Sequence, residues 1–404
     1  MNYYEKSKEA YKRVFDRLGI GDVTVIALAS GGDFTDNFSH EFQTFCEIGE
    51  DTLFYDETTN TYYNREVTPS KAPTKETNEE MLPREDVFGE GIVSVEKLVE
   101  FLNIPIEKTV KTLLYKDELN QIYAVAVRGD YEVSEEKLKK VLNVKSIELL
   151  SEQEIFEKTG AQVGYAGILD LPSDIKIICD EALESMINFE VGANKTNYHT
   201  INANWGRDIQ KPEQFYDIKV TKEGDLNPKT GKPYKYFKAA EVGNIFPLEI
   251  KFSKAFDFNV TNEKGEQEIV YMGCYGIGVT RLMGVIAEVK SDYKGLVWPI
   301  QIAPYHVHLL NIGNKETEAF RKAESLYNSL IEQNVEVLWD DRDEAPGKKL
   351  NDADLIGIPI RVVVSEKSLS NGGYEVKLRN KNEVMLLDET KLIEFIKKQI
   401  NYIV

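Results

Sequence analysis

The sequence predicts a multidomain α+β protein, and three observations lead to this fold class. First, 404 residues exceed what one ordinary hydrophobic core holds, so two to four domains are expected. Second, strand-like runs dominate residues 1–68 and 209–300. Third, helical and strand-like patterns alternate over residues 87–208 and 301–404, which is typical of α/β units.

The composition fits a globular protein, with 42% hydrophobic and 29% charged residues. No stretch approaches the ~20 apolar residues that cross a membrane, and the first residues do not form a signal peptide pattern. The three cysteines, Cys46, Cys179 and Cys274, lie far apart without a CxxC spacing, which argues against a disulfide framework and a cysteine zinc site. We therefore expect a cytoplasmic protein, with no membrane contact and no structural metal.

The formal net charge of −19 bears on the possible partners. It argues against a protein that coats nucleic acid through bulk positive charge. A local basic track on an acidic body remains compatible with it.

The first domain, residues 1–68, is expected to begin with a helix and continue with strands. Residues 11–18 have helical spacing and end before a glycine-containing turn. Four strand-like runs follow, at residues 23–29, 38–45, 52–55 and 61–63. Residues 69–86 contain three prolines among Lys, Thr and Glu, which is a linker composition.

Two α/β units are expected further along the chain. The unit at residues 87–208 begins with an amphipathic helix capped by Ser94 and continues with strands at 109–115 and 122–127. The unit at residues 301–404 alternates strands with helices. Its expected elements are strands at 307–310, 335–339 and 360–364, a helix at 320–333, a polar loop at 340–349 and a final helix at 389–402.

The most informative local pattern is a glycine-rich stretch at residues 273–281, which reads GCYGIGVTR. It follows an apolar run and precedes a helix-like segment at 282–288. Glycines on a strand leave room for a flat ligand against bare backbone. Arg281, on the first helical turn, is suited to stacking on that ligand or to contacting a phosphate beside the helix N-terminus. The alternative interpretation is close packing of a glycine-rich strand on a helix. A dinucleotide fingerprint is a poor match, because it requires glycine at position 281.

Several blocks occur in an order that resembles bacterial-type prolyl-tRNA synthetases, which are class II aminoacyl-tRNA synthetases. The glycine-rich stretch is similar to motif 3 of that class. Each block is weak alone, but their shared order covers nearly the whole chain. The other blocks are SHEF at 39–42, TVKTL at 109–113, GAN at 192–194, EVG at 241–243 and DADLIGIP at 352–359.

The resemblance implies an architecture for these units. Residues 1–68 and 209–300 would form a partial class II antiparallel catalytic sheet, with residues 69–86 as a linker. Residues 87–208 would be an inserted α/β editing domain, and residues 301–404 an α/β anticodon-binding domain.

The resemblance also implies an activity and its ligands. The family activates proline with ATP and Mg²⁺, transfers it to proline tRNA, and hydrolyses mischarged alanyl-tRNA. It acts as a homodimer. Its motifs 1 and 2, which precede the region matched here, are not recognisable in this sequence.

We therefore expect an incomplete chain that does not form prolyl-adenylate alone, because losing a positioned cation costs roughly 10³-fold in rate. Such a chain would be a truncated protein, an engineered piece, or part of a split synthetase whose second chain supplies motifs 1 and 2. Two alternatives stay open. One is a stand-alone deacylase of mischarged proline tRNA, and the other is a non-catalytic tRNA-binding remnant.

For the ATP and aminoacyl-adenylate site, the resemblance implies that Arg281 contacts adenine and the γ-phosphate. Glu41 is suited to holding magnesium, although a cross-strand polar pair is an equal alternative. Asn244 stands where the family has histidine and replaces one hydrogen bond but not the charge. The full set is Gly276 and Gly278 as the adenine floor, Cys274 as a wall, His40 and Glu41 beside nucleotide and amino acid, and Arg281 as the catalytic residue.

For the editing pocket, the resemblance implies Lys111 as the catalytic residue that holds the phosphate and ribose of the terminal adenosine. His199 would bound a small cavity, and Gly164 would begin the loop that closes over the substrate. A solvent-facing lysine and a structural histidine are the alternatives. Ile168 replaces a family proline after Gly167, and we expect a more flexible loop because isoleucine does not fix φ.

For tRNA recognition, the resemblance implies that Arg342, Lys348 and Lys349 meet anticodon phosphates and base edges. These residues lie on the polar loop expected at 340–349. The alternative is a solvated charged loop, since acidic residues dilute the basic charge there.

Overall fold

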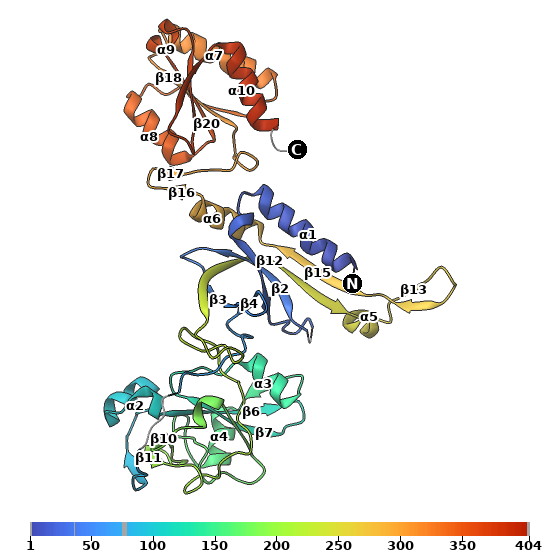
Figure 1. Cartoon of the computed structure of the whole chain (residues 1–404), viewed down its shortest axis with the longest axis vertical. Helices are drawn as coiled ribbons and strands as arrows, with labels where there is room; N and C mark the ends of the chain where they lie inside the picture. The colour runs from blue at the N-terminus through green and yellow to red at the C-terminus, as the bar shows by residue number, and fades with distance from the viewer. Residues whose placement is uncertain (1, 36, 75–78, 402–404) are drawn as a thin grey trace.

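The computed structural model describes residues 2–35, 37–74 and 79–401. Three bodies lie in line, with the sheet built from the N-terminal strands in the middle (Figure 1). The inserted module lies at one end of that line and the C-terminal domain at the other. Part of the expected linker, residues 75–78, and the expected helix end at Tyr402 lie outside the described residues.

The central sheet has six strands in the order β15-β12-β2-β1-β4-β3. Its pairs are antiparallel except β1 with β4. The long strand β12 pairs with β2, β3 and β15, and a register shift at Glu241–Gly243 accommodates its bend. The strands are β1 (Thr24–Ala29), β2 (Ser39–Phe45), β3 (Asp51–Asp56), β4 (Thr61–Asn64), β12 (Lys235–Glu249) and β15 (Met272–Ile277).

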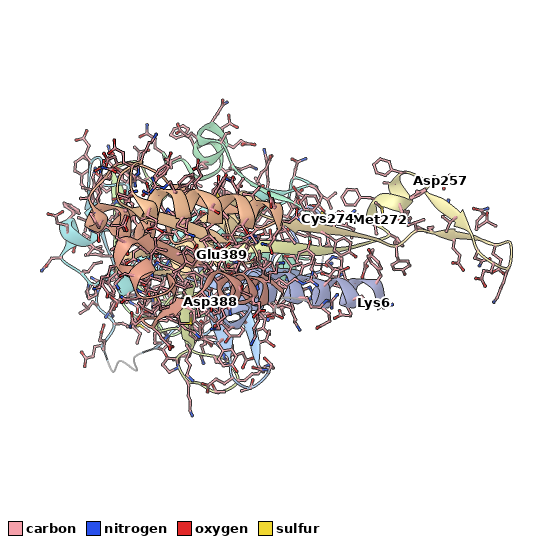
Figure 2. All side chains as sticks on the ribbon, turned by 90° about the horizontal axis from the view of Figure 1, so that it is seen from above. Lys6, Asp257, Met272, Cys274, Asp388 and Glu389 are labelled. Carbon is pink, nitrogen blue, oxygen red and sulfur yellow. The ribbon has the colours of Figure 1, made fainter. Side chains whose placement is uncertain are left out.

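Two helices cover one face of this sheet, α1 (Asn2–Arg17) and α6 (Val279–Val289). Their apolar sides meet the sheet in a core that includes Phe15, Phe42 and Leu282. The opposite face carries the polar side chains of Glu41 and Gln43 beside a small apolar cluster that includes Ala27 and Leu53. A hairpin of β13 (Asn259–Thr261) and β14 (Gln267–Ile269) follows the short helix α5 (Lys251–Ala255). Beyond Asp257, this hairpin projects away from the body (Figure 2).

The inserted module contains two small sheets, ordered β8-β6-β7-β9 and β10-β11-β5. Serine side chains cap α2, α3 and α4, which explains where these helices begin. Its strands are β5 (Glu85–Phe88), β6 (Val110–Asp117), β7 (Ile122–Arg128), β8 (Ile147–Leu149), β9 (Lys176–Cys179), β10 (Phe189–Gly192) and β11 (Tyr198–Ala203). Its helices are α2 (Val95–Leu102), η2 (Ile106–Lys108), α3 (Glu135–Leu142), α4 (Glu152–Thr159) and η3 (Glu181–Leu183).

The boundaries of this module differ from the sequence-based ones. Strand β5 begins at Glu85, inside the stretch expected to be linker, because it pairs with β11. Ile209 and Ile218 are buried in the module's cores, so the chain stays with the module past residue 208. The next strand of the central sheet is β12, which begins only at Lys235.

The C-terminal domain is a five-stranded sheet, ordered β19-β18-β20-β21-β22, with parallel pairing at β18. Its elements are β18 (Val307–Ile312), α7 (Glu318–Glu332), β19 (Val337–Asp340), α8 (Pro346–Ile356), β20 (Ile360–Ser365), α9 (Glu366–Ser370), β21 (Tyr374–Leu378), β22 (Val384–Leu387) and α10 (Glu389–Asn401). The expected loop at 340–349 is partly wrong, because α8 begins at Pro346, a residue suited to a first helical turn.

The turn η1 (Gly21–Val23) joins α1 to β1 within the central body. The short pair β16 (Ser291–Asp292) and β17 (Gly295–Leu296) lies between α6 and the C-terminal domain. Among the described helices, none is long and apolar enough to span a membrane. The described residues also hold no cluster of three or more metal-ligating side chains.

Candidate functional site

A cavity of about 340 Å³ lies in the inserted module, between the two small sheets and α2. Its lining comes from sequence segments that lie far apart: α2, β6, the loop at 163–166, β10 and β11. Three residues predicted for the editing pocket, Lys111, Gly164 and His199, all line it. The fold therefore brings this predicted set together in one place.

Lys111 extends from β6 at this cavity and is partly exposed. Its Nζ donates to the Tyr131 carbonyl oxygen at 3.1 Å and to the Glu132 carboxylate at 2.6 Å. Because Glu132 is mostly solvent-exposed, this ion pair is weak and exchangeable. The ammonium is thus available to an anionic ligand at the cavity.

The loop over the cavity is held by close backbone packing. Gly164 has φ +94°, and a Cβ there would approach Val93 to 2.6 Å. The Asn194 side chain accepts from the Gly167 N–H at 2.8 Å and donates to the Gly167 carbonyl at 3.2 Å. Ile168 is buried in the module's core. The hydrogen bonds of Asn194 and the burial of Ile168 therefore hold the loop where the family has proline. This packing gives no support to the expectation of a more flexible loop.

His199 and Glu190 form a buried pair at the cavity, each only 2% exposed. His199 Nδ1 lies 2.9 Å from Glu190 Oε1, and His199 Nε2 lies 2.9 Å from the Ile92 carbonyl oxygen. Burial raises the pKa of Glu190, and the hydrogen bond and charge of His199 oppose that shift. Sequence reasoning missed Glu190. The available signal was a lone carboxylate between Phe189 and Val191 in an apolar strand.

The glycine-rich strand β15 lies at the edge of the central sheet. A Cβ at Gly276 would come no closer than 3.9 Å to any neighbour, and one at Gly278 no closer than 3.5 Å. Close helix–strand packing therefore does not require glycine at either position, which favours an open surface for a ligand. Cys274, on the same strand, is half-buried.

Arg281 lies on the first turn of α6, with its side chain half-exposed. Its Nη1 donates to the Glu241 carbonyl oxygen at 2.9 Å and lies 3.9 Å from the Glu241 carboxylate. Burial raises the pKa of Glu241, and the charge of Arg281 opposes that shift. The guanidinium thus lies against β12, beside the glycine-rich strand.

His40 and Glu41 do not share a site, although they are neighbours on β2. His40 meets α1, where it contacts the Tyr4 hydroxyl at 2.9 Å and Lys8 Nζ at 3.1 Å. Successive residues of a strand face opposite sides. The expectation that His40 contributes to the ligand site is therefore wrong, because its side chain lies on the face that α1 covers.

Glu41, on the other face, is buried in a polar cluster. Its carboxylate accepts from Gln43 Nε2 at 2.9 Å and from Asn64 Nδ2 at 3.2 Å. Burial raises the pKa of Glu41 to about 7. Both hydrogen bonds already occupy this carboxylate, which leaves it less suited to a magnesium ion. The cross-strand polar interpretation of Glu41 fits this geometry better.

Three basic residues predicted for tRNA contact differ in exposure. Lys349 is 1% exposed, and its Nζ donates to the carbonyl oxygens of Asn311 and Asp340. The prediction that it faces tRNA is wrong, because the first turn of α8 points it into the domain. Arg342 is bound by Asp340 and Asp352, and exposed Lys348 by Glu344.

Comparisons with known proteins identify the two peripheral bodies. Residues 89–209 match the family "Aminoacyl-tRNA editing domain", and residues 306–399 match "Anticodon binding domain". The chain is 40% identical over 402 residues to the proline–tRNA ligase of Thermoanaerobacter sp. (strain X514). This alignment spans 99% of the chain and 69% of that relative.

The chain belongs to the proline–tRNA ligase family. It is 37% identical to the ligase of Listeria innocua, over 96% of the chain and 68% of that protein. A solved structure, Giardia lamblia prolyl-tRNA synthetase in complex with prolyl-adenylate, matches 41% of this chain and 36% of its own, with 26% identity and a TM-score of 0.37. The chain is thus a multidomain α+β member of an aminoacyl-tRNA ligase family, with an editing and an anticodon-binding domain.

Proposed function

We propose that the cavity of the inserted module hydrolyses alanine from mischarged proline tRNA. The observation that carries this proposal is that Lys111, Gly164 and His199, from three distant segments, line a single cavity of about 340 Å³. The match of residues 89–209 to editing domains supports the same assignment.

In this mechanism, the Lys111 ammonium holds the phosphate and ribose of the terminal adenosine at the cavity. A water molecule attacks the carbonyl carbon of the ester, with the neighbouring tRNA hydroxyl assisting. The bond between that carbon and the tRNA oxygen breaks, which releases alanine and the free tRNA end. Discrimination rests on size, since a small cavity admits alanine and excludes proline.

The test is hydrolysis of alanine-charged proline tRNA by the full chain and by Lys111→Ala. We expect the variant to lose about 10²-fold in rate, since a charge-assisted contact contributes up to ~3 kcal/mol. Lys116→Ala is the matched control, because Lys116 lies on the same strand but pairs with Glu148 and Glu154. Hydrolysis by neither the chain nor its variants would instead favour the tRNA-binding remnant.

A second proposal concerns proline activation. The open surface at Gly276 and Gly278, with Arg281 beside it, supports a nucleotide site. Magnesium would enter with the phosphates of ATP, and proline tRNA would approach through the C-terminal domain. In this proposal the flat base of the nucleotide lies on the bare backbone at Gly276, and Arg281 contacts it from the start of α6.

We further propose that this 404-residue chain, assayed alone, does not form prolyl-adenylate. Strand β15 is an edge strand of the central sheet, and its outer edge pairs with no other strand among the described residues. Tyr271, just before this strand, and Val279 and Met283, on the helix α6 that follows it, are strongly exposed. A second polypeptide of different sequence that pairs with this edge would complete the sheet, as in a split enzyme. Proline-dependent ATP–pyrophosphate exchange at an ordinary rate by the chain alone would disprove this proposal.

A further inference from the structure

The buried pair of His199 and Glu190 has a hydrogen-bonding pattern that limits what the cavity can bind. A carbonyl oxygen only accepts, so His199 Nε2 must donate its proton to the Ile92 carbonyl at 2.9 Å. One more proton lies between His199 Nδ1 and Glu190 Oε1, which are 2.9 Å apart. It belongs either to the acid or to the imidazolium, and the pair is neutral in both arrangements.

The second carboxyl oxygen, Glu190 Oε2, is buried and accepts no hydrogen bond of ordinary geometry. The backbone N–H of Val110 lies close enough to the carboxyl to lower its pKa, but Oε2 keeps room for a better-placed donor. In both arrangements of the shared proton, Oε2 is purely an acceptor. A buried acceptor without a donor is costly, and native structures that retain one usually have a functional reason. Because Glu190 lines the cavity, the missing donor is available from a ligand bound there.

Local backbone structure explains how an acid comes to lie here. The pairing of β10 with β11 changes register between Phe189 and Val191, beside Asn202 with φ +57°. Such irregularities re-aim side chains and occur next to active sites. The Glu190 side chain meets His199 from the neighbouring strand, whereas Phe189 and Val191 enter the apolar core.

We propose that Glu190 Oε2 accepts a hydrogen bond from the α-ammonium group of the aminoacyl ester, which makes Glu190 a specificity residue of the cavity. This inference rests on the proposed editing function. An ammonium group is a donor without acceptors, so it complements Oε2 in hydrogen bonding. It also complements Glu190 in charge, because a nearby positive charge favours the arrangement in which the shared proton lies on His199 and Glu190 is ionised. The side chain of the amino acid is then selected by size and its amino group by Glu190.

The test compares two esters of proline tRNA, alanyl and lactyl, in which a hydroxyl group replaces the ammonium at equal size. Each kcat/KM is divided by the spontaneous hydrolysis rate of the same ester, because the ammonium also activates the ester. We expect the unmodified chain to prefer the alanyl ester by about tenfold or more, as for a hydrogen bond to a charged group. This comparison requires no variant and holds even if a substitution at Glu190 impairs folding.

Glu190→Gln then removes the charge and keeps the shape and the contact to His199. We expect it to lose about tenfold on the alanyl ester and little on the lactyl ester. Glu157→Gln, the same change at an exposed position on α4, should leave the ratio unaltered. Equal losses on both esters, or an unchanged ratio, would overturn the role of Glu190 alone. Failure of the unmodified chain to hydrolyse either ester would overturn both this role and the editing proposal.

Discussion

Two adjacent residues of β2, His40 and Glu41, illustrate how strand geometry divides a sequence motif. Both belong to the SHEF block, yet His40 contacts Tyr4 and Lys8 of α1, whereas Glu41 contacts Gln43 and Asn64. The alternation of side chains along a strand separates them onto two faces. Of the two, only Glu41 lies on the face of the sheet away from α1.

Glu41 leads to a pH-dependent stability prediction. Burial raises its pKa from 4.5 to about 7, and the nearby carboxylates of Glu241 and Asp51 add to this shift. Because the pKa of Glu41 is higher in the folded chain than in the unfolded chain, its protonation stabilises the fold fully at pH values below the unfolded-state pKa of 4.5. This stabilisation is lost as the pH rises through the folded-state pKa of about 7. Relative to Glu41→Gln, the wild-type chain should therefore lose about 3 kcal/mol of stability across that range.

The measurement is the urea midpoint of the two proteins at pH 5 and pH 8. The urea midpoint of the variant should rise relative to that of the wild-type chain at pH 8, because glutamine keeps an acceptor for Gln43 and Asn64 without a buried charge. An equal difference at both pH values would show that Glu41 is already ionised in the folded chain at pH 5.

At the scale of elements, the start of α8 determines which basic residues reach solvent. Pro346 begins the helix, so Lys348 and Lys349 lie on its first turn rather than on a loop. Their side chains leave in different directions. Lys348 is exposed, whereas Lys349 fills a buried position between β18 and β19. Burial lowers the pKa of Lys349.

We predict that Lys349→Met destabilises the C-terminal domain by about 2–4 kcal/mol, because two buried carbonyl oxygens lose their donor. The salt dependence of proline tRNA affinity should not change. Lys348→Met should leave stability within ~0.5 kcal/mol and, if it meets a phosphate, reduce the salt slope by about one. A reduced slope in Lys349→Met would contradict its buried role.

At the scale of the whole molecule, a buried ionic cluster joins the inserted module to the segments that enter and leave it. Lys219 is 0% exposed. Its Nζ donates to the Ser70 carbonyl at 3.1 Å and to the carboxylates of Glu181 at 2.6 Å and Asp217 at 3.3 Å. Burial opposes the charge, but these carboxylates with Asp180 raise the pKa of Lys219. Ser70, at the start of the stretch with linker composition, is therefore held against the segment that leaves the module.

We predict that Lys219→Met destabilises the junction by about 3–5 kcal/mol, since it leaves buried Asp180 and partly buried Glu181 without this cation. Limited proteolysis should then cut the chain between the central sheet and the module faster than in the wild-type chain. Lys229→Met is the control, because Lys229 is mostly exposed and its ion pair with Asp56, at 3.6 Å, contributes little to stability. Equal cleavage rates in the two variants would show that Lys219 does not hold the junction.

Much of the fold could be predicted from the chain's local patterns. Periodicity located the strands at 23–29, 38–45 and 360–364 close to β1, β2 and β20, because apolar alternation and burial are coupled. It did not find β21 and β22, which are short antiparallel strands with mixed polarity. It also placed the module's end at 208, since the apolar residues that follow pack on the module without forming strands.

For the candidate sites, residue types and order along the chain determined the family, the glycine-rich strand and the lysine and histidine of the editing pocket. Tertiary structure alone decided which side chains meet. It joined Lys111, Gly164 and His199 around one cavity and added the buried acid Glu190. It also turned His40 toward α1 and buried Lys349. The physical reason is that side-chain exposure and hydrogen-bond partners depend on contacts between distant segments, which no local pattern encodes.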